Sequence, residues 1–302
     1  SFIEKYFGVR LPMQAVNAEG TAEIDFNFVW FSRLFHYIFY DLNGDDSREA
    51  ALASAVLFNQ DLDRQIATAK QQYSTNLESA NTVLARCLRL QQSGTPGMDD
   101  LAIRINLTGF LVGAVLPLIN TICQVIDQLI SRPCILEQAA TAAKTEMDGD
   151  QLLLNPLQGF VLEALRFSPG DPVIYRHCKS RTELLSASYR SSVSANTLVM
   201  AWNSSAMFDP KYVDQPWQFN PNRPSRDYLH FGHMSHVCAG KYIVMSVIPA
   251  IIQELLSRYE MARIPGTSGY PTKHGITVSE FDVLVRPRSS DHLVQAISTV
   301  TP

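Results

Sequence analysis

The sequence has little of what would mark several common classes of protein. Lys and Arg number 25 against 29 Asp and Glu, so the formal net charge is −4. Nucleic-acid binders usually carry a basic excess or stripe, and none is present. With 15 Gly and 16 Pro the chain is not of low complexity. Five widely spaced cysteines, with no Cys-x-x-Cys pair, argue against a disulfide framework and a zinc site. A reducing compartment therefore fits the chain best.

A leader peptide and a membrane span are not predicted either. Charged residues, Glu4 and Lys5, stand where a leader needs an apolar core. The apolar run 107–126 is about long enough to cross a membrane. It contains Pro117 and Asn120, however, and no aromatic belt or basic flank frames it. We predict a buried helix, no transmembrane span, and a cytoplasmic or intracellular protein, with membrane association left open.

What is present predicts a mainly α protein with minor β structure. The aromatic residues of 24–40 predict core packing or the wall of an apolar pocket. We expect one domain over 1–302, with a helical part, 1–168, and a second part, 169–302, that holds a small β region and one more helix. The predicted helices are 59–90, 99–130, 134–146, 155–167 and 240–259, the strands 173–175 and 197–200, the irregular loop 203–230, and a hairpin lies near 275–286.

The segment 231–240, Phe-Gly-His-Met-Ser-His-Val-Cys-Ala-Gly, carries the most specific chemistry. Cys238 ends a loop and directly precedes a predicted helix, whose unpaired N–H groups and dipole favour a thiolate over a thiol. The thiolate is the form that ligates metals. Gly240 leaves room for a flat macrocycle close to the backbone. The alternative is that Cys238 is a small buried hydrophobe, as most lone cysteines are.

This segment resembles the cysteine-ligand loop of cytochromes P-450, in which Phe, Gly, a second Gly, a basic residue, Cys and Gly follow at fixed spacing. Met234 stands in place of the second Gly. The resemblance implies a cytochrome P-450-like fold and haem b (iron protoporphyrin IX) as the cofactor. It also implies Cys238 as the thiolate ligand to the iron and a hydrogen bond from His236 to a propionate. The matching residues are Phe231, Gly232, His236, Cys238 and Gly240.

Two segments upstream of the cysteine resemble the same family. Glu163 and Arg166 resemble its Glu-x-x-Arg helix, in which the two side chains pair on one helical face. Arg176 follows ten residues later, near the position from which an Arg of the family reaches a haem propionate. The loop before the cysteine resembles the family's meander, whose Arg completes a triad with Glu and Arg. Gln218 replaces that Arg, so we predict an incomplete triad unless Arg223 substitutes.

In the family, the long helix before Glu-x-x-Arg crosses the haem on the oxygen side, which implies that role for 99–130. Val115 and Leu116 stand where monooxygenases place an acid and a Thr that relay protons. Pro117 stands where hydroperoxide isomerases carry an Asn that assists O–O cleavage, and Asn120 lies one turn later. The candidate catalytic residues are Gly113, Ala114, Pro117, Asn120 and Thr121.

Most of the chain resembles, at low density, the P-450-like domain of fungal fatty-acid dioxygenase/diol synthase fusions, the psi-factor-producing oxygenases. Residues 106–112, 124–127 and 228–232 carry this likeness. A complete P-450 has more chain before its distal helix, so we expect the N-terminal helices and part of the main sheet to be lacking here, as in a fragment. The implied partners are an apolar small-molecule substrate and either an N-terminal dioxygenase domain or the remaining P-450 segment.

Three functions follow as hypotheses. The favoured one is a haem-thiolate enzyme that acts on a lipid or other apolar substrate by fatty-acid hydroperoxide isomerase or peroxygenase chemistry. The missing acid–Thr pair favours it over a reductase-dependent monooxygenase of a natural product. The third is a degenerate, non-catalytic module that braces a partner dioxygenase domain. Met234, Pro117 and Gln218 favour that reading, whereas intact Cys238 and Glu163 oppose it.

Overall fold

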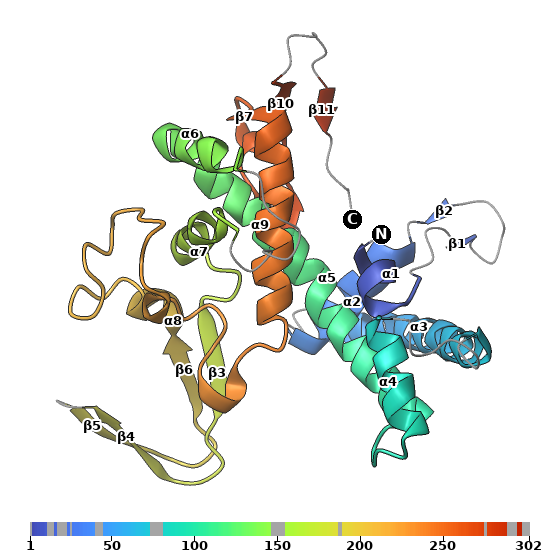
Figure 1. The fold of residues 1–302 in the computed structure, drawn as a ribbon. Helices are drawn as coiled ribbons and strands as arrows, with labels where there is room; N and C mark the ends of the chain where they lie inside the picture. Colours follow the sequence, from blue (N-terminus) through green and yellow to red (C-terminus); the bar gives the residue numbers. More distant parts are fainter. Residues whose placement is uncertain are drawn as a thin grey trace. The chain divides into compact units, whose positions relative to one another are not determined.

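The computed structural model describes ten stretches of the chain in two compact units, Ser1–Pro117 and Leu118–Thr301, each with buried apolar residues of its own. Helices dominate both units, and the strands are short (Figure 1). The described residues are 2–10, 15–16, 23–24, 26–39, 45–72, 81–145, 155–186, 189–274, 277–288 and 295–297.

The first unit is a set of helices with one short strand pair. Its elements are α1 (Phe2–Phe7), β1 (Ala15–Val16), β2 (Glu23–Ile24), α2 (Phe26–Phe39), α3 (Asp45–Gln72), α4 (Val83–Gln92) and the first half of α5 (Asp100–Ile130). Helix α3 buries Phe58, Leu62 and Ile66, which recur at helical spacing. The predicted single helix over 59–90 is wrong, because Thr82 begins a new helix: its hydroxyl accepts a hydrogen bond from the Ala85 N–H (3.2 Å).

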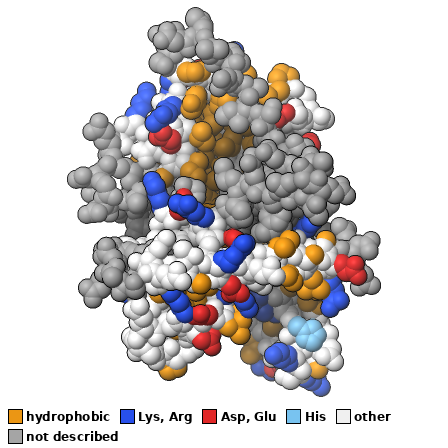
Figure 2. All heavy atoms as spheres, turned by 90° about the vertical axis from the view of Figure 1, so that its right-hand side faces the viewer, with side chains coloured by type: hydrophobic (Ala, Val, Ile, Leu, Met, Phe, Trp, Pro, Cys, Tyr) orange, Lys and Arg blue, Asp and Glu red, His pale blue; other side chains and the backbone are white. Residues whose placement is uncertain are grey.

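Charged side chains of both signs share the surface of this unit. Lys70 pairs with Asp100, and Arg104 pairs with Asp63. On the face drawn in Figure 2, Lys and Arg side chains lie among Asp and Glu side chains. Residues 26–39 of the predicted aromatic stretch 24–40 form α2. Of its described side chains, Phe35 is buried and Phe39 is exposed.

Helix α5 matches the predicted helix 99–130 and runs without interruption through Pro117. Asp99 caps it by accepting a hydrogen bond from the Ala102 N–H (2.8 Å). By length and composition it is the one helix among the described residues that could cross a membrane, and 33% of its most apolar stretch is buried. The prediction of a buried helix therefore holds for the face of Ile103 and Leu107, but not for the exposed face of Ile105.

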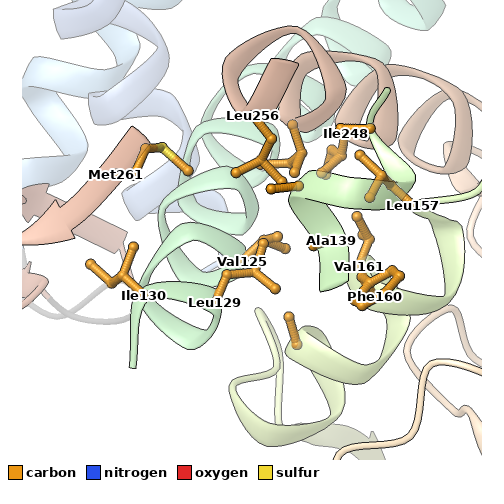
Figure 3. Close-up of a cluster of buried hydrophobic side chains, with 14 of the residues drawn as sticks. Val125, Leu129, Ile130, Ala139, Leu157, Phe160, Val161, Ile248, Leu256 and Met261 are labelled. Carbon is orange, nitrogen blue, oxygen red and sulfur yellow. The ribbon is translucent and has the colours of Figure 1, made fainter. Parts of the chain in front are cut away.

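The second unit packs the rest of α5 against α6 (Pro133–Ala142), α7 (Gln158–Phe167) and α9 (Lys241–Arg258). Strands β7 (Tyr259–Arg263), β9 (Thr277–Glu280) and β10 (Val283–Pro287) add residues to the same apolar cluster. Figure 3 shows Met261 of β7 among them. Among its fully buried members are Val125, Leu129, Leu157, Ile248 and Leu256. This core sets α7 against α9, the helix that directly follows the predicted cysteine loop.

The small β region of this unit consists of antiparallel pairs. The two predicted strands are present as β3 (Val173–His177) and β6 (Leu198–Trp202), which pair with each other, and β4 (Thr182–Ser186) pairs with β5 (Tyr189–Val193). The second pair was not predicted. The predicted hairpin near 275–286 has wrong bounds: β8 (Thr272–His274) pairs with β9, whereas β10 pairs with β7 and with β11 (Gln295–Ile297).

The predicted irregular loop 203–230 is confirmed in outline. It contains only α8 (Asn203–Ala206) and a short 3-10 turn, η2 (Ser225–Asp227). Two further 3-10 turns are η3 (Met234–His236) and η4 (Thr267–Gly269). The predicted helix 155–167 begins later, at Gln158, because Asn155 closes a turn before it by accepting a hydrogen bond from the Leu157 N–H (2.8 Å).

Candidate functional site

Cys238 lies between η3 and the start of α9, as the sequence predicts. Its backbone N–H donates to the carbonyl oxygen of Phe231 (2.7 Å), which closes the loop, and its own carbonyl accepts from the Lys241 N–H (3.1 Å). The cysteine is exposed, and so are all residues from 233 to 239. The reading of Cys238 as a buried small hydrophobe is therefore wrong, because the loop holds the thiol at an accessible surface.

Two backbone conformations shape this loop. Gly232 has a φ of +73°, and a Cβ there would lie 2.7 Å from the carbonyl oxygen of His236. A larger residue would thus be strained and would also clash. Met234, which replaces the second Gly of the family pattern, has a φ of 52°. The loop therefore keeps a left-handed backbone at this position although the residue that favours it is gone.

The space next to the sulfur is open. A Cβ on Gly240 would meet only the Sγ of Cys238, at 3.6 Å. Val237, 45% exposed, adds apolar surface beside it. An accessible sulfur, an absent side chain and apolar surface fit a flat, iron-bearing macrocycle such as haem. His236 is exposed in the same loop. Arg176 is exposed on β3, where its guanidinium donates to the Tyr175 carbonyl (2.8 Å) and pairs with no carboxylate of the described chain.

Glu163 and Arg166 form the predicted pair on α7, and both side chains are fully buried. Arg166 Nε donates to Glu163 Oε1 (2.8 Å) and Arg166 Nη2 donates to Glu163 Oε2 (2.9 Å). The same guanidinium donates to the carbonyl oxygens of Pro216 (2.6 Å) and Gln218 (3.1 Å). A two-pronged contact with a carboxylate and two carbonyls uses the planar geometry that only Arg offers. The pair therefore binds α7 to the loop that precedes the cysteine.

Arg223 completes the triad. Its Nε lies 3.2 Å from Glu163 Oε1, and its side chain is 3% exposed. It also donates to the carbonyl oxygens of Gln215 (2.7 Å) and Gln218 (2.9 Å). Of the two alternatives that the sequence left open, substitution by Arg223 is thus the one that the geometry supports. Gln218 contributes its main-chain carbonyl, while the residue itself is exposed.

The candidate residues of α5 differ in their surroundings. Gly113 is exposed, and Ala114 and Pro117 are half-buried. Asn120 is 4% exposed, and its Oδ1 accepts a hydrogen bond from the Val278 N–H of β9 (3.2 Å). Asn120 therefore ties the helix to β9. Thr121, on the same helix, is half-buried.

A small polar group surrounds Gly170, in the connection between α7 and β3. A Cβ there would lie 3.7 Å from Thr121 Oγ1, 3.8 Å from Gln124 Oε1 and 4.0 Å from Asn120 Nδ2. Gln124 is buried, and its Oε1 has no hydrogen-bond partner among the described residues. The candidate polar residues of α5 are thus gathered with Gln124, which sequence reasoning left out.

Sequence reasoning also missed Tyr228 and His230. The Tyr228 hydroxyl is buried, and burial together with the charge of Glu163 raises its pKa. The pKa of His230 is lowered to about 4, chiefly because the imidazole is buried. The two rings stack with centroids 5.5 Å apart. Nothing in a stretch without periodicity marks these side chains as buried, although their closeness to Phe231 in sequence was visible.

The chain resembles known proteins over most of its length. A family model described as cytochrome P-450 matches residues 13–291. Tabersonine 6,7-epoxidase isoform 1 of Catharanthus roseus is 25% identical over 199 residues, 59% of this chain and 38% of that protein. A bifunctional dioxygenase (DOX)-epoxy alcohol synthase (EAS) of Fusarium oxysporum is 28% identical over 129 residues, 42% of this chain and 10% of that protein. The chain thus spans less than half the length of these relatives.

The fold agrees with the family model. The crystal structure of a cytochrome P-450 (CYP102L1) matches 95% of this chain and 69% of its own chain, with a TM-score of 0.70 and 19% identity. The resemblance and the fold class predicted from the sequence are both confirmed. Since the family model covers nearly the whole chain and the fold agrees with it, this chain belongs to the cytochrome P-450 family.

Proposed function

We propose that the chain is the haem-thiolate part of an enzyme that rearranges or uses a lipid hydroperoxide. The observation that carries this proposal is the apolar pair Val115 and Leu116 on α5. Both side chains are aliphatic, so neither can hold or pass a proton where a monooxygenase needs it; Leu116 is 0% exposed and Val115 is half-buried. A substrate that already carries the O–O bond needs no such relay to activate dioxygen.

The chain's own residues have distinct roles in this proposal. Cys238 holds the iron of a haem, and Gly232 and Gly240 give the loop its shape and the macrocycle its space. His236 and Arg176 donate to the propionates, with Phe231 packed on the loop. A haem bound through a thiolate supplies the electron-rich iron that favours O–O cleavage.

On the α5 side, the proposed roles are those of positioning and exclusion of water. Gly113 has no side chain and Ala114 only a methyl group, and we propose that a substrate lies beside this part of the helix. Pro117 removes one N–H from the helix and thereby leaves a carbonyl oxygen without its helical donor. Asn120 and Thr121 are the polar side chains that follow on this helix, and the side-chain Oδ1 of Asn120 accepts from the Val278 N–H. We propose that the Thr121 hydroxyl and the Asn120 amide are the polar groups of this helix that orient a peroxide.

The dioxygenase–epoxy alcohol synthase relatives support this choice of substrate class. Two such fusions, from Pyricularia oryzae and Fusarium oxysporum, match parts of the chain. They also support a dioxygenase domain as the partner that would deliver a fatty-acid hydroperoxide. The second candidate function is a reductase-dependent monooxygenase, which the tabersonine epoxidase and other monooxygenase relatives favour.

The β3–β6 pair supports a further protein segment as a partner. Tyr175, Leu198, Met200 and Trp202 are each between 55% and 60% exposed on this pair. In the described part of the chain no third strand joins it. Large exposed apolar surfaces of this kind usually mark an interface. We propose that the remaining P-450 segment covers it. Supplying, in trans, the part of a relative's fold that this chain does not span should slow amide exchange in β3. Unchanged exchange would contradict the pairing.

The first experiment is the absorption spectrum of the reduced, carbon monoxide-bound protein, with Cys238→Ala beside it. Cys134→Ala is the matched control, because Cys134 is also an exposed free cysteine. A thiolate-type Soret band in the wild type and the control, and its loss in Cys238→Ala, is the expected result. Turnover of a fatty-acid hydroperoxide without NADPH and reductase supports the first function, and turnover only with both supports the second. A haem-free chain, after haem supplementation and with the remaining segment supplied, supports the non-catalytic module.

A further inference from the structure

His230 joins the cysteine loop to α7. Its Nε2 lies 3.0 Å from the carbonyl oxygen of Leu162. Because a carbonyl only accepts, Nε2 must carry the proton, and Nδ1 is then an unprotonated acceptor. Nδ1 is buried and has no hydrogen-bond partner among the described residues. A neutral imidazole with its proton on Nε2 therefore fits this geometry, because a second proton on Nδ1 would have no acceptor among the described residues.

His230 is also linked to Cys238 through the backbone of the loop. His230 directly precedes Phe231, whose carbonyl accepts the Cys238 N–H (2.7 Å). The Gly232 N–H donates to the Leu229 carbonyl (3.2 Å), which fixes the turn around the histidine. Leu162, at the other end, belongs to α7. A short series of backbone and imidazole bonds therefore connects this helix to the cysteine.

The charged neighbours make a second proton on His230 unfavourable. Arg166 lies close enough to lower its pKa, while Glu163 and the bond to Leu162 act in the opposite direction. Burial outweighs both, and the pKa is lowered to about 4. Tyr228, stacked on the ring, has its own pKa raised and stays neutral. Lys241, 6.0 Å from the Phe231 ring centroid, is the nearest cation of α9 to that ring.

We propose that His230 is a positioning residue for Cys238: the neutral imidazole holds the cysteine loop against α7, and its protonation releases the loop. The proposal deepens the proposed haem-thiolate function, on which the ligand role of Cys238 rests. An added proton on Nδ1 would be a buried cation with no acceptor, so the loop must open to let water reach it.

The sign of the pH dependence follows from the two pKa values. An imidazole in the unfolded chain has a pKa of about 6.5, above the folded value of about 4. Between these values the unfolded chain takes up a proton and the folded one does not. The contribution of His230 to the free energy of unfolding is therefore fully present above about pH 6.5, and it falls as the pH drops toward 4. The full effect on the folding equilibrium constant is roughly 300-fold, since it is set by the difference between the two pKa values.

The test uses His230→Gln and His230→Phe, with His233→Gln as the control because His233 is an exposed residue of the same loop. Gln keeps an N–H donor for Leu162 but cannot titrate in this range. Phe keeps the stacking on Tyr228 and loses the donor. Amide hydrogen exchange of residues 231–240 and urea unfolding, both from pH 4.5 to 7.5, are measured on the purified protein together with the ferrous–carbon monoxide spectrum.

We expect faster exchange in the loop at every pH for His230→Phe, and a loss of most of the acid sensitivity for His230→Gln. The thiolate-type Soret band should follow loop exchange, with acid loss in the wild type and not in His230→Gln. The proposal is overturned if His230→Gln keeps the pH dependence of the wild type, or if His230→Phe leaves loop exchange unchanged. A chain that binds no haem would contradict the proposed function, yet exchange and unfolding would still test the histidine.

Discussion

Removal of the Arg223 guanidinium tests the triad most directly. Glu163 is fully buried, accepts two hydrogen bonds from Arg166 and forms an ion pair with Arg223, whose Nε lies 3.2 Å from Oε1 without a hydrogen bond between them. Breaking a buried ion pair by removing one partner typically costs ~3–5 kcal/mol. Glu163 would keep its two bonds to Arg166 and one from the Asn220 N–H (2.9 Å). The lower end of the range therefore applies, and Arg223→Ala should reduce the free energy of unfolding by ~3 kcal/mol.

Two controls separate this network from general damage to the loop. Arg226→Ala removes a guanidinium three positions later whose side chain is 86% exposed, so it should cost less than about 0.5 kcal/mol. Gln218→Ala should be as mild, because both arginines bind the main-chain carbonyl of this residue and Ala keeps it.

The assay is urea unfolding at neutral pH, monitored by circular dichroism. All variants must show the same dependence of the free energy of unfolding on urea concentration. A loss of less than about 1 kcal/mol in the free energy of unfolding for Arg223→Ala would refute the reasoning, because removing a partner of a buried carboxylate should destabilise the fold by more. A large cost for Gln218→Ala would refute it in another way. It would mean that the Gln218 side chain holds the place that we assign to Arg223.

Three further substitutions test local packing by thermal unfolding. Gly159→Ala should cost more than about 2 kcal/mol, because its Cβ would lie 1.9 Å from the Pro221 carbonyl oxygen, and backbone there must move. Gly109→Ala on exposed α5, where a Cβ meets no atom within 4 Å, should instead stabilise by roughly 0.5–1 kcal/mol, and equal effects of the two changes would contradict this account. Asn120→Leu should cost about 1–3 kcal/mol, because it leaves the Val278 N–H buried without an acceptor, and no loss would show that water replaces the amide.

The sequence predicted the elements whose signals are local. The helices around 99–130 and 240–259 follow from long apolar periodicity, which the structure returns as α5 and α9. Cys238 and its loop were found because the residue types and their spacing are specific. The pairing of Glu163 with Arg166 needs only helical spacing, so it too was visible.

The loop 203–230, which contains the meander, has no local sequence signals of this kind. Residues 203–230 have little periodicity, and the family pattern pointed to Gln218 as the position of the missing Arg. The structure brings Arg223, five residues later, to the same carboxylate. In an irregular loop the reach of a side chain depends on the path of the backbone, and no local rule gives that path.

The sequence by itself therefore determined the family, the helices around 99–130 and 240–259 and the position of the cysteine loop, since each depends on residues that are close in the chain. Only the tertiary structure decided which Arg lies beside Glu163, that Asn120 accepts a hydrogen bond from β9, and that His230 reaches Leu162 while its Nδ1 is buried. Each of those depends on groups far apart in sequence: Asn120 and Val278 are 158 residues apart, and His230 and Leu162 are 68 apart. The physical reason is that burial and a hydrogen-bond partner are properties of packed neighbours, which the chain acquires only on folding.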